Sequence, residues 1–440
     1  MNILIIGSGA REHAIAYALH RSKQQPHIYC YGTSVNPGIK QMSHNYVSGN
    51  VTDVNAITAA ATEWQIDLAI IGPEAPLEKG LADALWHASI PTIGPKKNLA
   101  QIETSKCFAR DLMHKYAIPG LPRYRSFDNL NDVPEFLLEL DENNYVVKAN
   151  GLMSGKGVKV AGDHLHSFAE AISFCKEILA HGQTFIIEEK LVGQEFSFMS
   201  FCDGERLIPM PIVQDHKRAF NDDKGPNTGG MGSYSDVNHR LPFLSEGDFQ
   251  QAQKIMQSTL HALSTECQEK YIGILYGSFV ATKHGVSVIE FNARFGDPEA
   301  LNVLTILDSD FVTICERMVN GDLHHDHVNF LPQATVCKYA VPHGYPDSPL
   351  KDVAIDIAAV KNKTNLYLAA VNAVEGKIFA TGSRTAAYVG VADSISAAEE
   401  ISEKEVQGID GPLFHRDDIG SDKLIKRRID MMRELRSDKK

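Results

Sequence analysis

The N-terminal hundred residues limit the possible folds most strongly, because short apolar runs alternate there with helical patterns. Ile3 to Ile6 is fully apolar and ends at Gly7, which is typical of a buried parallel strand. The further elements expected here are a helix around 14–19, strands at 27–31 and 68–71, a short strand that the segment Thr92–Pro95 closes, and a helix at 54–64. Such an alternation forms a parallel sheet with right-handed crossovers. We therefore expect residues 1–103 to fold as a doubly wound α/β domain.

After residue 103 the expected strands come in adjacent pairs, which indicates antiparallel pairing and an α+β fold. The expected strands are 145–149, 157–161, 185–188, 195–201, 207–213, 274–281, 286–291, 335–341, 366–371 and 386–391, and the expected helices are 168–179, 246–263 and 396–405. We expect a central domain over 104–328 and a small C-terminal α+β domain over 329–425. The tail over 426–440 is charged and helix-prone and could fray.

Composition excludes several classes of protein. Lys and Arg number 43 against 55 for Asp and Glu, giving a formal net charge of −12, whereas general nucleic-acid binders carry a basic excess. The seven cysteines are odd in number and widely spaced, which argues against a disulfide framework and a structural zinc site. No signal peptide and no run of about 18 apolar residues is found. We expect a cytoplasmic protein, monomeric or weakly homodimeric, without nucleic-acid or membrane partners.

The first motif, Gly7–His13, places glycines between a strand and a helix, where backbone N–H groups can approach an anion. A dinucleotide site would have a third glycine where Glu12 stands and an acidic residue near Cys30. Neither is present, so a phosphate-bearing ligand is favoured over a nicotinamide cofactor. The structural alternative is a tight strand-to-helix turn with Arg11 as a surface charge.

A second turn, Ile71–Pro76, follows another expected strand at the same edge of the sheet. Ligands of doubly wound folds bind at the carboxyl ends of the strands. Glu74 could accept hydrogen bonds from sugar hydroxyls there, although Gly-Pro turns are also common in ordinary loops.

The central domain carries a lysine on a strand, Lys148, followed by a loop with three glycines and Lys156. The spacing is not that of a P-loop, but backbone N–H groups and ammonium charges could surround polyphosphate in a similar way. A flexible hairpin tip is the alternative. Glu188 and Glu195 flank a connector between two strands and suit an adenine edge and a ribose; a solvated charge run is the plainer reading.

Two further blocks indicate anion and metal binding. Gln214–Phe220 clusters cations beside the glycine-rich stretch Gly225–Gly232, which suggests a mobile anion clamp. In the block that follows Val288, strand alternation puts Glu290, Asn292 and Arg294 on one face. Carboxylate and amide oxygens are hard ligands for Mg²⁺, and an arginine can hold a carboxylate in bidentate fashion. The alternative is a half-exposed edge strand.

In this order the motifs resemble those of the ATP-grasp superfamily and, more narrowly, of the phosphoribosylamine–glycine ligase family. The resemblance rests on the blocks Gly7–Ala14, Gly72–Leu77, Gln214–Arg218, Gly225–Gly232 and Glu290–Glu299. It implies an ADP-forming ligase of purine biosynthesis, in which ATP phosphorylates the carboxylate of glycine. The amine of 5-phosphoribosylamine then attacks the glycyl phosphate, giving glycinamide ribonucleotide and phosphate. ATP with Mg²⁺ or Mn²⁺ is the implied cofactor.

The resemblance also implies roles for individual residues. ATP would be held by Lys106, Lys148, Lys156, Glu188, Leu191 and Glu195. Phosphoribosylamine would face Gly9, Arg11, Glu12 and Glu74. The metal ligands would be Glu290 and Asn292. Arg294 would neutralise the glycine carboxylate or its acyl phosphate, and Asp215 and Lys217 would line the central cleft.

The C-terminal domain departs from the family pattern. A Phe-His-Ala-Gly segment is usual there, followed later by Gly-Gly-Arg, whereas this chain has Tyr367–Ala370 and Gly382–Arg384. These departures leave open a divergent ATP-grasp ligase that joins an amino acid to a different amine. A nicotinamide oxidoreductase rests only on the first Gly-x-Gly. A non-catalytic scaffold is disfavoured by the intact Glu290, Asn292 and paired lysines.

Overall fold

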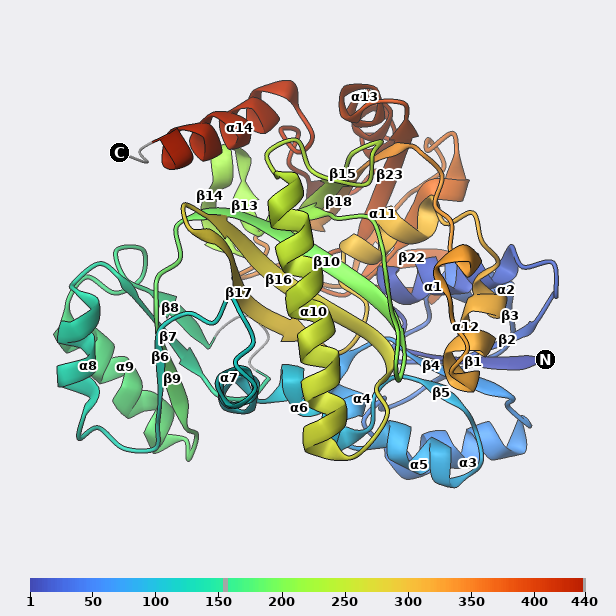
Figure 1. Ribbon diagram of the computed structural model, residues 1–440. Coiled ribbons are helices and arrows are strands. Elements are labelled where there is room, and N and C mark those ends of the chain that lie inside the picture. The colour runs from blue at the N-terminus through green and yellow to red at the C-terminus, as the bar shows by residue number, and fades with distance from the viewer. Residues whose placement is uncertain (153–156, 438–440) are drawn as a thin grey trace.

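The computed structural model describes residues 1–152 and 157–437 (Figure 1). The N-terminal strands are β1 (Asn2–Ile6), β2 (His27–Gly32), β3 (Ser43–Ser48), β4 (Leu68–Ile71) and β5 (Thr92–Ile93). The helices between them are α1 (Ala10–His20), α2 (Pro37–Met42), α3 (Val54–Glu63), α4 (Glu74–Glu78) and α5 (Leu81–His87). The sheet order is β3-β2-β1-β4-β5 and every pairing is parallel, so the predicted doubly wound domain is confirmed.

The order of this sheet fixes where a ligand can bind. The chain passes from β1 to β2 on one side, whereas β4 pairs with β1 on the other side. The strand order therefore reverses between β1 and β4, and their carboxyl ends open a crevice at the switch point. Gly7 follows β1 directly and Gly72 follows β4, so both glycine turns lie at this crevice.

Two elements of this domain were not foreseen. The strand β3 lies at the edge of the sheet, only Ser43 and Tyr46 in it are partly buried, and its other positions are exposed, so it lacks the apolar run that marks β1. The short helix α2 precedes it and begins at Pro37, with the Asn36 side chain accepting a hydrogen bond from the Gly38 N–H. Helix signals this short are weak in sequence.

The central region contains two antiparallel sheets. The first has the order β6-β9-β7-β8 and packs against α8 and α9 with a hydrophobic core of its own. The second has the order β11-β10-β16-β17, and the long helix α10 crosses it (Figure 1). The strands are β6 (Tyr124–Phe127), β7 (Tyr145–Ala149), β8 (Val158–Val160), β9 (Phe185–Glu189), β10 (Gly193–Asp203), β11 (Leu207–Pro209), β16 (Ile272–Thr282) and β17 (Gly285–Asn292). The helices are α6 (Lys97–Thr104), α7 (Lys106–Lys115), α8 (Val133–Leu140), α9 (Phe168–Ala180), α10 (Glu246–Cys267), α11 (Glu299–Thr305) and α12 (Phe311–Asn320).

A third sheet, of order β12-β15-β18-β23-β20 with β24 beside β18, combines strands from two parts of the chain. Its strands are β12 (Gln214–Asp215), β15 (Gly232–Ser235), β18 (Ala334–Pro342), β20 (Leu366–Leu368), β23 (Ala386–Ala392) and β24 (Leu413–Phe414). A small sheet, β19-β22-β21, is formed by β19 (Val353–Ile355), β21 (Val371–Val374) and β22 (Lys377–Ala380). Sheet pairing thus crosses the boundary expected near residue 329.

Between β12 and β15 stands a separate two-stranded hairpin of β13 (Arg218–Phe220) and β14 (Lys224–Asn227), joined by the 3-10 turn η1 (Asn221–Asp223). The remaining elements are the 3-10 turns η2 (His325–His327) and η3 (Lys363–Asn365) and the helices α13 (Ile395–Val406) and α14 (Asp422–Ser437). No helix within the described ranges is long and apolar enough to cross a membrane.

Three expectations need correction. The strand expected at 207–213 ends at Pro209, because Pro211 has no N–H to donate to a partner strand. The strand expected at 366–371 divides into β20 and β21, which belong to different sheets. The described part of the tail is folded onto the body rather than frayed, because Arg436 donates to both carboxylate oxygens of Asp248 at 2.7 and 2.8 Å.

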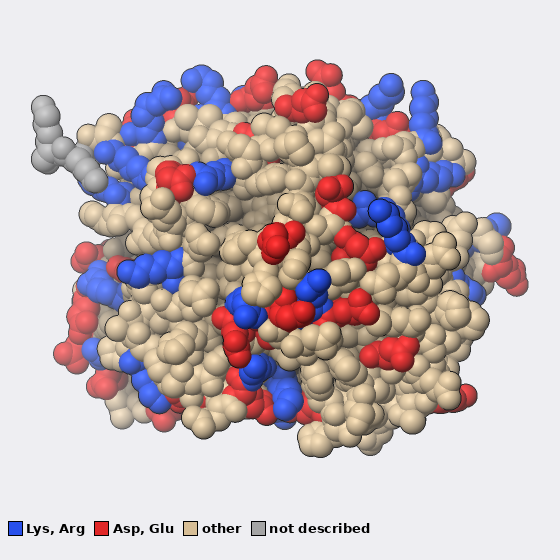
Figure 2. All heavy atoms as spheres, turned by 45° about the vertical axis from the view of Figure 1, so that its right-hand side comes forward, with Lys and Arg blue, Asp and Glu red and all other residues tan. Residues whose placement is uncertain are grey.

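The described surface mixes both signs of charge. Figure 2 shows acidic and basic side chains beside one another over one face, without an extended basic area among the residues drawn in colour. The seven cysteines all lie within the described residues and are free.

Candidate active site

The turn after β1 is built around the side chain of Glu12. Its Oε2 accepts from the Gly9 N–H at 2.7 Å and its Oε1 from Arg11 Nε at 2.6 Å. The side chain occupies space that glycines leave open: a Cβ on Gly7 would lie 2.8 Å from the Glu12 side chain, and one on Gly72 would overlap it outright. This explains why the chain has Glu12 where a dinucleotide fold has its third glycine, and it links the turns after β1 and β4.

The Arg294 guanidinium lies beside these turns. Its Nη2 is 2.9 Å from Glu103 Oε1 and its Nε is 3.4 Å from Glu74 Oε2. Arg294 Nη1 and Arg11 Nη1 both donate to the Phe295 carbonyl, at 3.1 and 3.3 Å. The structure therefore brings the expected phosphoribosylamine residues and Arg294 into one cluster, although they come from distant parts of the sequence.

Burial and neighbouring charges shift the pKa values of Glu74 and Glu103 in opposite directions. Burial raises the pKa of Glu74, but Arg294 and Arg11 outweigh burial and lower it below its usual value. Burial raises the pKa of Glu103 above its usual value in spite of Arg294. Glu103, at the end of α6, was missed by the sequence reasoning, because nothing in the sequence distinguishes it from an ordinary helix carboxylate. It also accepts from the Ala293 N–H at 2.7 Å.

A buried ionic triad connects the two central sheets. Glu188 on β9 is 2.5 Å from Arg110 Nε on α7 and 2.6 Å from Lys148 Nζ on β7. Arg110 Nη2 and Lys148 Nζ also donate to the Ile289 carbonyl of β17, at 2.7 and 3.1 Å. Burial raises the pKa of Glu188, but Arg110 and Lys148 outweigh it and bring the pKa to about 2. Glu188 is thus fully engaged with protein cations and orients Lys148.

Lys106 stands next to this triad at the start of α7. Its Nζ donates to the Gly151 carbonyl at 2.9 Å, at the entrance of the glycine-rich loop. Burial lowers the pKa of Lys106, with Glu290 opposing the shift. Lys156 in that loop lies outside the described residues.

Glu290 and Asn292 lie on one face near the end of β17, while Arg294 stands beyond the strand, a correction to the expectation that one strand carries all three. Within the described part of the chain, no hydrogen bond or salt bridge reaches the Glu290 carboxylate. Burial raises its pKa, but Lys217, Lys148 and Lys106 outweigh burial, so the pKa lies below its usual value. Asn292 Oδ1 accepts from Arg294 Nη2 at 3.2 Å.

These donors fit a divalent cation. A carboxylate that accepts no hydrogen bond from the residues described and an amide oxygen two positions away are two hard oxygen ligands, as Mg²⁺ prefers when phosphate oxygens complete its shell. No cluster of three or more His, Cys, Asp or Glu side chains that could hold a metal by itself occurs in residues 1–152 and 157–437.

Asp215 ends β12 at the edge of the third sheet, and Lys217 follows it two positions later. Lys217 Nζ is 3.8 Å from Glu195 Oε2 on β10. Burial lowers the pKa of Lys217, but Glu195 and Glu290 outweigh burial and raise it. Burial and Glu299 raise the pKa of Asp215 well above its usual value.

Two residues that received no role from sequence reasoning complete this region. Glu299, at the start of α11, is buried and accepts from Ser197 Oγ at 2.8 Å and Tyr276 OH at 2.6 Å. Arg384 reaches over from the C-terminal region and donates to the carbonyls of Gly229 and Asp297 at 2.8 and 2.7 Å. Both residues belong to segments named in the sequence analysis, Glu290–Glu299 and Gly382–Arg384. No pattern in the neighbouring residues indicates which groups they contact.

The other expected nucleotide residues lie in or just after the connector between β9 and β10. Leu191 is half-buried in that connector, and the side chain of Glu195, on β10, is 56% exposed. The expected nucleotide residues that the structure describes are therefore distributed around the triad and the start of β10. Their roles remain predictions.

Models of one family match almost the whole chain. They are described as phosphoribosylglycinamide synthetase N domain, ATP-grasp (A) domain and C domain, and they match residues 1–103, 104–300 and 335–422. A relative from Methanocella arvoryzae, named phosphoribosylamine–glycine ligase, is 46% identical over 99% of this chain and 100% of its own length. One of the same name from Methanosarcina acetivorans is 47% identical over 99% of this chain and 98% of its own.

Solved structures agree in fold. A phosphoribosylamine–glycine ligase from Thermotoga maritima superposes with a TM-score of 0.80 at 26% identity, over 95% of this chain and 100% of that one. A biotin carboxylase domain from Hydrogenobacter thermophilus has a TM-score of 0.71 at 13% identity over 98% of this chain and 93% of its own, a likeness of fold alone. With all three family models in order and relatives matched end to end, the chain belongs to the phosphoribosylglycinamide synthetase family.

Proposed function

We propose that this protein joins glycine to 5-phosphoribosylamine at the expense of ATP, forming glycinamide ribonucleotide, ADP and phosphate for purine biosynthesis. The observation that carries the site assignment is the position of Arg294. This cation lies in one cluster with the turns after β1 and β4, and it also lowers the pKa of Glu290 beside the lysines of the central sheets. A glycine carboxylate bound there would lie between the nucleotide and the amine acceptor.

The lysines and the carboxylate of the central sheets suit phosphoryl transfer from ATP. Lys106 and Lys148 supply positive charge for the phosphates, and Glu188 keeps Lys148 in place. Glu290 and Asn292 would hold a divalent cation, Mg²⁺ or Mn²⁺, which when bound neutralises the phosphate oxygens. Leu191, in the connector between β9 and β10, and Glu195, on β10, would border the nucleotide.

Arg294 is suited to the glycine carboxylate because it already holds carboxylates. Its Nε lies 3.4 Å from Glu74, whose side chain is 35% exposed, whereas the bond to the buried Glu103 is shorter at 2.9 Å. A substrate carboxylate can therefore replace Glu74 at the guanidinium while Glu103 keeps Arg294 in position. Glu74 is then free to accept hydrogen bonds from the ribose of the acceptor.

The second step joins the two substrates. The amine of phosphoribosylamine, bound at Gly9, Arg11 and Glu12, attacks the carbonyl of glycyl phosphate; the C–N bond forms, the C–O bond to phosphate breaks, and phosphate leaves. The attacking amine must lose a proton. Asp215 fits this role, because its raised pKa makes its carboxylate a stronger base than an exposed one. Lys217 provides charge for the departing phosphate.

ADP release from purified protein tests the reaction. Release that requires glycine and freshly made phosphoribosylamine together, with glycinamide ribonucleotide as the product, is the expected result. Release that requires glycine and a different amine would instead support the divergent ligase.

Glu290→Ala tests the metal site. We expect the variant to fold normally and to lose metal-dependent turnover, because the remaining amide oxygen alone binds a divalent cation weakly. Glu205→Ala is the control, since Glu205 is an exposed carboxylate that pairs only with Lys270 on the surface. Full activity of Glu290→Ala at limiting metal would refute the assignment.

A further inference from the structure

We propose that the C-terminal helix α14 is a positioning element for the active site: it holds the tip of the hairpin whose base carries Lys217. The hairpin is residues 218–227, formed by β13, η1 and β14, and is called the clamp hairpin below. The inference rests on the proposed function for the role of Asp215 and Lys217. The family models end at residue 422, where α14 begins.

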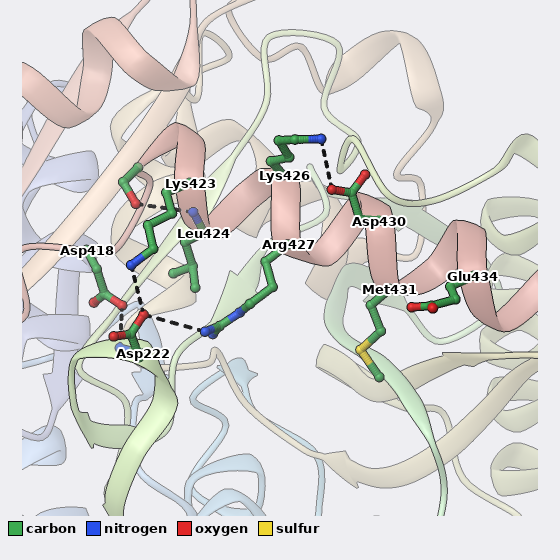
Figure 3. Close-up of a pocket in the computed structure, with 10 residues that line it drawn as sticks. Asp222, Asp418, Lys423, Leu424, Lys426, Arg427, Asp430, Met431 and Glu434 are labelled. Carbon is green, nitrogen blue, oxygen red and sulfur yellow. Dashed lines mark hydrogen bonds and ion pairs between the residues drawn. The ribbon is translucent and has the colours of Figure 1, made fainter.

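Charged side chains from α14 and the segment before it converge on the tip of the clamp hairpin. Asp223 accepts from Arg428 Nη2 at 2.6 Å, from Arg416 Nη2 at 3.1 Å and from Arg427. Asp222 lies 3.4 Å from Lys423 Nζ and 3.6 Å from Arg427 Nη1. Figure 3 shows Lys423 and Arg427 pointing from α14 toward Asp222.

The backbone of the tip needs such support. Asp222 and Asp223 both have positive φ angles, 60° and 57°, a conformation that non-glycine residues adopt only at a cost. The Asp222 N–H donates to Asp418 Oδ2 at 2.9 Å, which adds a backbone bond to the side-chain pairs. Burial raises the pKa of Asp223, but Arg428 outweighs burial and brings it to about 2, so the carboxylate stays charged at working pH.

Little apolar packing holds the clamp hairpin in place. Ala219 is buried, but Phe220 is 50% exposed. A crevice of about 440 Å³ lies between the tip and α14, and a second of about 360 Å³ is lined by Phe220, Pro226 and Phe414. The Phe220 and Phe414 rings lie 6.0 Å apart between centroids, and Arg218 pairs with Asp163 at 2.7 Å. Beside these two contacts, the hairpin is held by the charged contacts at its tip and the bonds at its base.

The base of the clamp hairpin carries Lys217. The Lys217 carbonyl accepts from the Thr228 N–H at 2.7 Å and from Thr228 Oγ1 at 2.8 Å, which closes the hairpin directly at this residue. The other end of α14 is fixed by Arg436, which binds Asp248 and the Thr282 carbonyl. A helix anchored at one end and bonded to the tip at the other sets the direction of the hairpin and thus the place of the Lys217 ammonium group.

Asp223→Asn tests this inference, because it removes the charge and keeps the shape. Two measurements are needed: the rate of tryptic cleavage after the exposed Lys224, which requires no substrate, and steady-state kinetics. We expect cleavage about tenfold faster, and kcat about tenfold lower with the KM for phosphoribosylamine within about twofold, because the acceptor site is untouched. Asp223→Glu should restore most of both.

Lys426→Gln is the matched control, since Lys426 stands on the same helix and, among the residues described, pairs only with Asp430. It should leave cleavage and kcat unchanged. Wild-type values in Asp223→Asn would overturn the inference, and so would faster cleavage with unchanged kcat, because the hairpin would then not position the site. Should the variant lose its overall fold, seen as a collapsed thermal midpoint, Arg427→Gln replaces it with the same expected results. A wild-type protein without ligase turnover would overturn the proposed function, while cleavage would still report whether α14 holds the tip.

Discussion

Replacing Glu188 by glutamine tests the ionic triad that joins the central sheets. The change keeps the shape of the side chain and removes its charge. Arg110 and Lys148, whose nitrogens lie 2.5 and 2.6 Å from the carboxylate, then lose this counter-ion, and Lys148 keeps only its longer-range attraction to Glu290. Both side chains are less than a tenth exposed, so water replaces little of the lost interaction.

Two routes give a similar magnitude for this loss. The pKa of Glu188 is about 2 against an ordinary 4.5, and one pKa unit is about 1.4 kcal/mol, so the charged carboxylate contributes about 3 kcal/mol to stability. Removing one partner of a buried ion pair costs about 3–5 kcal/mol in other proteins. Since the pKa is lowered, this contribution is present above pH 4.5 and is lost as the pH falls toward 2. The glutamine variant should lack that part of the acid sensitivity.

Hydrogen exchange at β7 and β9 is the assay. Both tryptophans, Trp64 and Trp86, lie in the N-terminal domain, so their fluorescence does not report on these strands. A loss of about 3 kcal/mol should accelerate exchange there about 100-fold. The control is Glu189→Gln, which breaks an exposed pair with Arg123 and should cost at most about 1 kcal/mol. If the two variants exchange alike, the argument from buried charge is wrong.

Two further predictions concern the N-terminal domain. Gly72→Ala should displace Glu12 and raise the KM for phosphoribosylamine at least about tenfold without changing the KM for ATP. The control Gly247→Ala, at an open position of a helix, should leave both KM values unchanged. An unchanged KM for phosphoribosylamine in Gly72→Ala would contradict the packing of Glu12 against Gly72. Burial lowers the pKa of His13 to about 4, so between pH 6.5 and 4 the unfolded chain takes up a proton that the folded one refuses. The free energy of unfolding should therefore fall by about 3 kcal/mol over that range. Thermal unfolding of His13→Gln should not show this fall. The prediction is refuted if both proteins show it.

The sequence predicts correctly those elements in which consecutive residues are apolar because they are buried. Both β1 and β4 are apolar at every inward position and are found within one residue of their expected ends. The edge strand β3 is missed because half-exposed polar residues form it and only pairing with β2 makes it a strand. The break between β20 and β21 is missed because it depends on which sheet each half joins.

The candidate site shows the same division. Residues in turns at strand ends can be named as candidates because the turn pattern itself marks them, as at Gly9 and Glu74. Their partners are not found when the contact is distant in sequence: Arg110 is 78 positions from Glu188, and Arg384 is 87 positions from Asp297. A sequence pattern identifies candidate groups, whereas the protein charges that tune them become visible only after folding.

The structure shows what is contacted by the C-terminal residues that depart from the family pattern, and these contacts bear on the identity of the amine acceptor. The segment Tyr367–Ala370 touches the N-terminal domain through one aromatic ring and through backbone atoms. The Tyr367 ring lies edge-on to the His13 ring, with 5.6 Å between centroids. The Leu368 N–H donates to His13 Nδ1 at 2.9 Å, and the Leu368 carbonyl accepts from Asn36 Nδ2 at 2.7 Å. Backbone groups are the same for leucine and for the histidine usual in the family, so these bonds do not depend on that side chain.

The second departure from the family pattern, at Gly382–Arg384, also leaves the contacts of its segment in place. Arg384, the residue that Gly382–Arg384 shares with the family pattern, makes the bonds to the Gly229 and Asp297 carbonyls, whereas Ser383 replaces a glycine at a position that contributes no side-chain bond to this cluster. The hypothesis of a different amine acceptor arose because the residues of these two segments differ from the family pattern. The contacts of these two segments run through backbone atoms, through the retained arginine and through the aromatic ring of Tyr367, which the phenylalanine usual in the family would also supply. The altered residues therefore supply no reason for a changed acceptor, in agreement with the names of the full-length relatives.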